Sequence, residues 1–373
     1  MIPVCEPLLD GNEEKYILEA VRSTWISSAG RFITDFEEQM STYCGTRFGV
    51  SCSSGTTALH LACLALGIGP GDEVIIPTFT LIVSANVVIA CGAKPVLVDS
   101  DPDTWCIDPQ KIEEKITSKT KAIMAVHMYG HPCAMDSIMM LAQKHGLKVI
   151  EDCAEAHGAT YQGKKVGSFG DVGAFSFYGN KILTTGEGGM LLTNDKTIAA
   201  KARLLRNQAF EEPRFVHREI GYNYRLTNVQ AAIGLAQLER IKQKIAKKRH
   251  IAATYEKLLK SADLTLPVEK PQSLNVYWMY GIVLGSSYGT KDEVVKRLGQ
   301  NGIQTRSFFC PMHQQPVYRS GSSLFPKVDG HYPVADHLFK RGFYLPSGLP
   351  LSDDQLTEVA EQLLACRKTT LSA

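Results

Sequence analysis

The chain has 373 residues, of which 44% are hydrophobic and 21% are charged, and its formal net charge at pH 7 is +2. This composition is ordinary for a folded globular protein and excludes a disordered or fibrous chain. The near-neutral charge gives no general attraction to nucleic acid or to a membrane surface, so partners must be inferred from specific sites. The length predicts two or three domains, which is enough to enclose a buried site.

The N-terminal residues, Met1 to Glu6, lack a basic segment followed by an apolar stretch, and no apolar run reaches the length of a membrane span. The ten cysteines are scattered singly, without a CxxC pair or the spacing of metal ligands. We therefore expect reduced thiols, no metal site, no membrane contact, no nucleic-acid partner and a cytoplasmic location.

In chain order, a helix is expected first, at residues 13–22. Between about residues 45 and 195, short apolar β-branched runs then alternate with helical patterns. The predicted strands in this region are residues 48–51, 72–77, 95–99, 122–126 and 148–152. Such alternation predicts an α/β domain with a mostly parallel sheet covered on both faces.

After Thr227 the pattern changes to a long helical stretch from Asn228 to about Lys260. Its charged half, Lys242 to Arg249, is expected to be a solvated face. A connection at 270–273 leads to the remaining predicted elements, which are strands at 276–284 and 303–308, a helix at 291–299 and a final helix after Ser352. We predict two parts, residues 1–245 with the large domain and residues 246–373 as a smaller α+β domain.

Lys181 ends the run Phe175–Lys181 and is followed by the glycine-rich segment 186–189. This arrangement is typical of a lysine that forms a Schiff base with pyridoxal phosphate (PLP), because the amine must be held at a fixed point beside a group that binds the phosphate. Ser176 could supply a hydroxyl to that phosphate. A single lysine near glycines is more often a solvated charge beside a turn. The interpretation as a PLP lysine therefore needs support from other residues.

Two further segments follow predicted strands. Ser53 to Thr57 lies between a strand and a helix, where free backbone N–H groups can bind an anion or where Ser and Thr can simply cap the helix. Asp152 ends another strand and can pair with the pyridine nitrogen of PLP or act as a helix cap. Ala154 would leave room for the flat ring, and His157 is expected to be a packed, hydrogen-bonded histidine. Parallel sheets place their ligands at these strand ends.

Together these segments resemble the DegT family of PLP-dependent sugar aminotransferases. The matching segments follow the family order over nearly the whole chain and are residues 54–59, 71–75, 126–130, 151–155, 175–189, 221–228 and 230–232. The resemblance implies the PLP-dependent transferase fold type I, which is the fold of aspartate aminotransferase. It also implies catalysis through PLP and its pyridoxamine phosphate form.

The resemblance assigns roles to individual residues. Lys181 is implied to be the Schiff-base lysine and proton shuttle, and Asp152 the partner of the pyridine nitrogen. Ser176 is implied to bind the phosphate together with the backbone of Gly55 and Thr56. Ala154 would lie against the cofactor ring.

Glu155 stands where many members of the family have a glutamine near the cofactor hydroxyl. Asn223 resembles an asparagine that reaches the phosphate of the neighbouring subunit. The resemblance therefore implies a homodimer with shared active sites.

Further matching segments are residues 1–4, 179–181, 184–190, 277–280 and 311–313, with Pro316 and Tyr318. In these segments the chain most resembles the subgroup of the family that aminates C4 of GDP-4-keto-6-deoxymannose to form GDP-perosamine, a sugar of O-antigen and lipopolysaccharide biosynthesis. The amino donor would be L-glutamate. Arg306, His313 and Tyr318 are predicted substrate contacts. Two departures are Leu81, where relatives usually have an aromatic residue, and Cys310, where this subgroup often has histidine or tyrosine. Amination at C3, a UDP-linked or dTDP-linked sugar, and a free eight-carbon keto sugar acid remain open.

Other classes of protein are less well supported. The segment 158–164 begins a P-loop pattern, but Lys165 follows where Ser or Thr must bind Mg²⁺. The glycines at 67–71 lack the GxGxxG spacing of a dinucleotide site. A PLP-dependent sugar dehydratase would have histidine in place of Lys181. A non-catalytic PLP-binding regulator remains a distinct alternative, although no helix-turn-helix module is visible.

Overall fold

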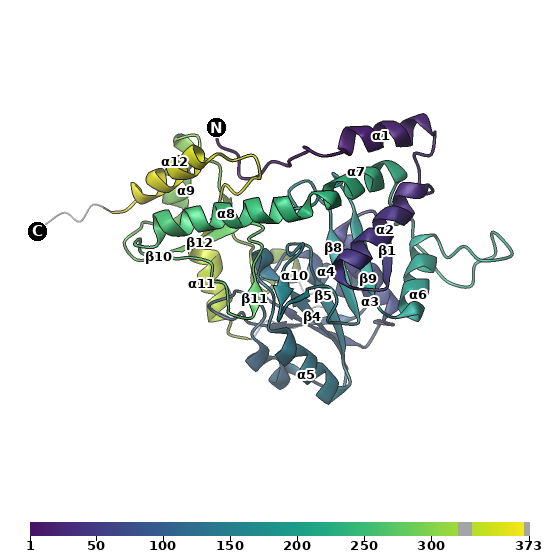
Figure 1. The fold of residues 1–373 in the computed structure, drawn as a ribbon. Helices are drawn as coiled ribbons and strands as arrows, with labels where there is room; N and C mark the ends of the chain where they lie inside the picture. Colours follow the sequence, from purple (N-terminus) through teal and green to yellow (C-terminus); the bar gives the residue numbers. More distant parts are fainter. Residues whose placement is uncertain (320–329, 369–373) are drawn as a thin grey trace, which may run out of the picture.

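The computed structural model describes residues 1–319 and 330–368 (Figure 1). Its largest sheet has seven strands in the order β1-β9-β8-β5-β4-β2-β3. These strands are β1 (Phe48–Cys52), β2 (Glu73–Pro77), β3 (Lys94–Val98), β4 (Thr120–Val126), β5 (Lys148–Asp152), β8 (Val172–Ser176) and β9 (Gly189–Thr193). Only β9 is antiparallel to its neighbours in the sheet. The predicted α/β fold with a mostly parallel sheet is thereby confirmed.

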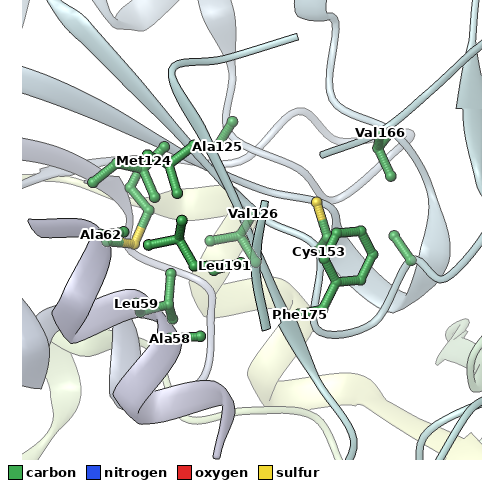
Figure 2. Close-up of a cluster of buried hydrophobic side chains, with 14 of the residues drawn as sticks. Ala58, Leu59, Ala62, Met124, Ala125, Val126, Cys153, Val166, Phe175 and Leu191 are labelled. Carbon is green, nitrogen blue, oxygen red and sulfur yellow. The ribbon is translucent and has the colours of Figure 1, made fainter. Parts of the chain in front are cut away.

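Helices cover this sheet, and their apolar faces form the main core together with its strands. They are α2 (Arg31–Cys44), α3 (Gly55–Ala65), α4 (Val83–Ala90), α5 (Met135–His145), α6 (Lys196–Arg206) and α7 (Asn228–Glu239), and α1 (Glu13–Arg22) packs against α7. Every residue of β8 and β9 is buried, as expected for the centre of a sheet covered on both faces. Figure 2 shows Leu59 and Ala62 of α3 beside Leu191 of β9.

A second, smaller core forms around a four-stranded antiparallel sheet in the order β10-β12-β14-β13. The strands are β10 (Leu264–Thr265), β12 (Tyr280–Leu284), β13 (Arg306–Ser307) and β14 (Gly342–Leu345), and the associated helices are α8 (Ile241–Leu259), α9 (Lys291–Gln300), α11 (Pro333–Arg341) and α12 (Asp353–Leu364). Figure 1 shows α8 extending from the end of α7 toward this smaller part of the molecule. Ile2 also belongs to this core, so the N-terminal segment reaches it.

Short elements complete the fold. A small sheet of order β11-β6-β7 contains β6 (Thr160–Tyr161), β7 (Lys164–Lys165) and β11 (Ser273–Leu274). The remaining single turns are η1 (Pro109–Lys111), η2 (Glu113–Lys115), η3 (Met128–Gly130), η4 (Met312–Gln314) and the short helix α10 (Pro316–Arg319). Within residues 1–319 and 330–368, none of the helices has the length and apolar character needed to cross a lipid bilayer.

Several predicted boundaries differ from the structure. The helical stretch from Asn228 is divided into α7 and α8 at Arg240, whose ψ of 6° departs from helical geometry. Of the strand predicted at 276–284 only Tyr280–Leu284 forms β12, and the strand predicted at 303–308 is limited to Arg306–Ser307. Helix α8 runs through residues 245 and 246, so the division there stays a prediction.

The expectation of a solvated charged face at Lys242 to Arg249 was wrong for two residues. Lys244 and Lys248 are each only 2% exposed. Both ammonium groups donate hydrogen bonds to backbone carbonyls of segments that pack against α8, which replaces the water they lose.

Candidate active site

A cavity of about 470 Å³ opens where the carboxyl ends of β5 and β8 meet the N-terminus of α3. Its lining includes most of the predicted cofactor residues, together with Arg306. The lining residues are Ser54, Gly55, Thr56, Leu59, Thr80, Leu81, Val83, Val126, Asp152, Ala154, Glu155, Ser176, Tyr178, Asn180, Lys181, Glu187, Trp278, Arg306, Phe309 and Tyr344.

Lys181 lies in the loop after β8 and is 9% exposed. Its Nζ is 3.8 Å from the centroid of the Trp278 ring. Burial lowers the pKa of Lys181, and the nearby carboxylates of Glu155 and Asp152 only partly oppose this effect. Lys181 therefore reaches its neutral, nucleophilic form at lower pH than an exposed lysine, as formation of a bond to an aldehyde requires.

Asp152 is the last residue of β5 and is 6% exposed. Its Oδ1 accepts a hydrogen bond of 3.1 Å from the backbone N–H of Ala154. Burial raises the pKa of Asp152, whereas the Ala154 N–H and the charge of Lys181 favour the ionised carboxylate. A cationic group entering the cavity would stabilise that carboxylate further.

Glu155 is 5% exposed, and its Oε2 accepts a hydrogen bond of 2.8 Å from the backbone N–H of Tyr129. Burial raises the pKa of Glu155 to about 7, against the opposing charge of Lys181. Both protonation states of this carboxyl group are therefore accessible near neutral pH.

The N-terminus of α3 forms the opposite side of the cavity. Ser54 caps this helix, with its Oγ accepting the Thr57 N–H at 3.2 Å. The N–H groups of Gly55 and Thr56 lie in the first turn, where an α-helix offers no carbonyl partner. A Cβ at Gly55 would lie 2.6 Å from the Cβ of Ser176, so only glycine allows this close approach. Helix N–H groups beside a serine hydroxyl form a suitable site for a phosphate.

Comparison with known proteins identifies the family that uses such a site. The sequence matches the DegT/DnrJ/EryC1/StrS aminotransferase family over residues 7–364. The chain belongs to this family. It is a PLP-dependent aminotransferase, and the cavity fits that cofactor because it combines a buried lysine, a buried carboxylate and an anion-binding helix terminus.

Individual relatives are similar over most of their length. GDP-perosamine synthase from Caulobacter vibrioides is 54% identical over 323 residues, which cover 85% of this chain and 86% of the relative. GDP-perosamine synthase from Escherichia coli O157:H7 is 46% identical over 97% of each chain. The crystal structure of the aminotransferase TlmJ from Streptoalloteichus hindustanus is 31% identical, covers 98% of both chains and has a TM-score of 0.91.

Three predicted contacts of the aminotransferase lie outside this cavity. Asn223 is exposed. His313 is 7% exposed and hydrogen-bonds through Nδ1 to Thr78 Oγ1 and through Nε2 to Asp336 Oδ1, each at 2.7 Å. The hydroxyl of Tyr318 donates to Asn86 Oδ1 at 2.6 Å. Of the two departures from relatives, Leu81 lines the cavity and Cys310 does not.

His157 is a packed residue of the aminotransferase, with its ring centroid 5.5 Å from that of Phe175. Both ring nitrogens are buried, and a hydrogen bond with the Ser176 backbone favours the protonated ring. Burial lowers the pKa of His157 to about 3, so the imidazole is neutral at physiological pH.

Trp278 and Asn180 were assigned no role from the sequence, although both line the cavity of the aminotransferase. Asn180 was part of the lysine motif, and its position next to Lys181 is the one signal that could have identified it. Trp278 is far from Lys181 in the sequence, and only the tertiary fold brings its ring over the amine.

One buried group resembles a metal site. Ligand atoms of His127, Glu151 and Cys153 all lie within 4.8 Å of one another. The Glu151 carboxylate is already occupied, however, because it accepts backbone N–H groups from Gly167 at 2.7 Å and from Phe169 and Gly170 at 2.7 and 2.8 Å. The Glu151 carboxylate therefore holds the turn at residues 167–170 next to the sheet.

Proposed function

We propose that this aminotransferase transfers the amino group of L-glutamate to C4 of GDP-4-keto-6-deoxymannose and forms GDP-perosamine. The observation that carries the proposal is the similarity to GDP-perosamine synthases over most of the chain, together with a cavity containing Lys181 and Asp152. The product is a precursor of surface polysaccharides such as O-antigen, and a cytoplasmic location is part of this proposal.

Lys181 and Asp152 would have different roles at the cofactor. PLP, when bound, supplies an aldehyde that accepts the amino group and a ring that stabilises negative charge on the substrate carbon. Lys181 would provide the covalent attachment and, once released from it, move a proton at that carbon. Asp152 would keep a proton on the ring nitrogen through a charge-assisted hydrogen bond. These roles explain why both side chains are buried at the same cavity.

Five other residues would bind and orient the cofactor. Gly55 and Thr56 would offer their backbone N–H groups to the phosphate, and Ser176 would offer its hydroxyl. Ala154 presents only a methyl group to the cavity and would let the flat ring approach the backbone. Glu155 would lie near the ring hydroxyl, where its protonation state affects the charge of the ring.

Arg306 is the proposed contact for the nucleotide part of the substrate. It is exposed, lies in β13 and lines the cavity. A guanidinium group at this position can pair with the diphosphate of a nucleotide-linked sugar. Direct sugar contacts by His313 and Tyr318 stay predictions, because both residues are engaged in hydrogen bonds outside the cavity.

We also propose a homodimer in which Asn223 completes the site of the partner subunit. The exposure of Asn223 is compatible with contact across an interface. Large apolar side chains are exposed on α1 and in the two loops that include Trp25 and Phe215. These residues are Leu18, Val21, Trp25, Ile26, Phe215, Val216 and Ile220. Their burial by a second subunit would supply a hydrophobic contribution to association.

The test is to incubate the PLP-loaded protein with L-glutamate and a panel of keto sugars. The panel contains GDP-4-keto-6-deoxymannose, UDP-linked and dTDP-linked 4-keto sugars, a nucleotide-linked 3-keto sugar and a free eight-carbon keto sugar acid. Mass spectrometry and NMR should identify a GDP-linked product aminated at C4. Amination only at C3, or only of a sugar without a nucleotide, would reject the substrate and leave aminotransferase activity intact. Binding of PLP without any amino transfer would favour a regulator.

A further inference from the structure

Lys248, in the middle of α8, is a buried cation outside the cavity lining. Only 2% of the residue is exposed. Its Nζ donates a hydrogen bond of 2.6 Å to the backbone carbonyl of Trp278 and a second hydrogen bond to the carbonyl of Ser347. Burial lowers the pKa of Lys248 to about 8, so the ammonium group remains mostly protonated at neutral pH.

Trp278 connects this buried cation to the cavity. Its indole Nε1–H donates a hydrogen bond of 2.8 Å to the backbone carbonyl of Asn180, the residue before Lys181. The face of the same indole lies over the Lys181 amine, with Nζ 3.8 Å from the ring centroid. A continuous series of contacts therefore connects Lys248 through Trp278 to the Asn180 backbone and to the Lys181 side chain.

Three other contacts bring the surrounding segments to the same point. The Sγ of Cys5 donates to the Asn180 carbonyl at 3.6 Å, and the N–H of Ser347 donates to the Val4 carbonyl at 2.9 Å. The Oγ of Ser347 accepts the N–H of Tyr280 at 2.9 Å. The N-terminal segment, the smaller sheet and the loop of Lys181 thus meet around Lys248.

The environment of the Lys248 ammonium group is unusual for a residue with only a packing role. Burying an ammonium group is costly, and a carboxylate normally compensates for it. Among the described residues, no carboxylate forms an ion pair with Lys248, whose hydrogen-bond acceptors are backbone carbonyls. Lys244, one turn earlier, is equally buried but donates to the Leu8 carbonyl at 2.6 Å and lies 3.9 Å from Asp10.

We propose that Lys248 is a positioning residue for the aminotransferase reaction, which fixes Trp278 and through it the backbone and amine of Lys181. This inference rests on the proposed role of Lys181 as the attachment point of PLP. Such a residue affects rate through geometry, because a displacement of a reacting group by about 1 Å can cost on the order of 10²-fold.

The test measures how fast apoenzyme forms its covalent link with PLP, followed by absorbance. Lys248→Met keeps the length of the side chain and removes the charge, whereas Trp278→Phe keeps an aromatic face and removes the hydrogen bond to Asn180. Both rates are expected to fall about tenfold through misplacement of the amine. Lys244→Met is the matched control and should stay within about twofold of wild type, because its contacts lead to the N-terminal segment.

A double variant distinguishes positioning from general destabilisation. If Lys248 acts through Trp278, Lys248→Met combined with Trp278→Phe should be no slower than the slower single variant. Multiplication of the two effects, or equal rates for Lys248→Met and Lys244→Met, would overturn the proposal. If Lys248→Met does not fold, Lys248→Arg is measured in its place. Arginine keeps a cation with N–H donors, so the rate of PLP attachment should stay within about threefold of wild type. A tenfold loss of this rate would contradict the proposal.

The proposed function has its own control in the same experiment. Lys181→Ala defines the absorbance change that occurs without covalent attachment. If wild type and Lys181→Ala behave alike, the assignment of Lys181 fails. If they differ while the Lys248 and Trp278 variants match wild type, only the positioning role fails.

Discussion

Gly55 and Ser176 pack so closely that a Cβ added to Gly55 would lie 2.6 Å from the Ser176 Cβ and 3.0 Å from its Oγ. One residue begins α3 and the other ends β8, so this contact sets the distance between a helix N-terminus and a hydroxyl. The proposed phosphate site depends on that distance.

Gly55→Ala should therefore weaken PLP binding, because the new methyl group must push α3 away from Ser176. We expect the dissociation constant to rise by about tenfold or more, the loss that accompanies one charge-assisted hydrogen bond. The constant can be measured by absorbance or fluorescence titration of apoenzyme. Gly299→Ala is the control, because a Cβ there meets no atom within 4 Å and the residue lies in α9. Equal affinity of the two variants for PLP would contradict the proposed phosphate site.

Asp152→Asn should keep the shape of the cavity but remove the negative charge proposed to hold a proton on the ring nitrogen. The catalytic constant is expected to fall on the order of 10²-fold or more, the usual effect of losing a preorganised electrostatic contact in the transition state. Single-turnover kinetics with L-glutamate provide the measurement. Asp354→Asn, an exposed carboxylate of α12, should have no effect on this rate. An unchanged rate in Asp152→Asn would make Asp152 a structural residue.

Glu155→Gln should change how the stability of the apoprotein depends on pH. The folded-state pKa of Glu155 is raised from 4.5 to about 7, so between these values the folded protein holds a proton that the unfolded chain releases. The free energy of unfolding therefore decreases as pH rises through this window, by at most about 1.4 kcal/mol per pH unit. Urea unfolding at several pH values should show a smaller decrease in Glu155→Gln. The same slope in both proteins would show that Glu155 ionises normally.

Asn223 variants test whether active sites are shared between subunits. Lys181→Ala and Asn223→Ala should each have low activity, and mixing them under subunit exchange should restore part of it. A mixed dimer would place both substitutions in one site and leave the other intact. Mass spectrometry of intact complexes can verify the exchange. Exchange without recovery of activity would place Asn223 outside the partner's site.

The sequence predicted the parts of the fold and site that depend on local patterns. The apolar runs before Asp152 and before Ser53 identified strand ends, and parallel strands bring such ends to one edge of a sheet. The motif that contains Lys181 is also local in sequence, and the structure places Lys181 in the same cavity as Asp152. His313 was assigned from a resemblance, but the structure places it in hydrogen bonds to Thr78 and Asp336, which no local pattern shows.

The burial of Lys248 could not be predicted in this way. A charged helical segment normally faces solvent, and the carbonyls that replace water come from Trp278 and Ser347, far along the chain. The hydrophobic periodicity of a helix contains no information about hydrogen-bond partners from distant segments. Contacts between distant segments therefore determine the part of the site that the sequence left unassigned.

The most direct test asks whether Lys181 carries PLP in this cavity. Borohydride reduction of the PLP-loaded protein would make the attachment permanent, and peptide mass spectrometry would locate it. We expect the cofactor mass on the peptide that contains Lys181 and its loss in Lys181→Ala. Lys242→Ala, which removes an exposed lysine of α8, should retain the cofactor mass. Cofactor attached to another lysine, or no attachment in a protein that transfers amino groups, would contradict the role of Lys181.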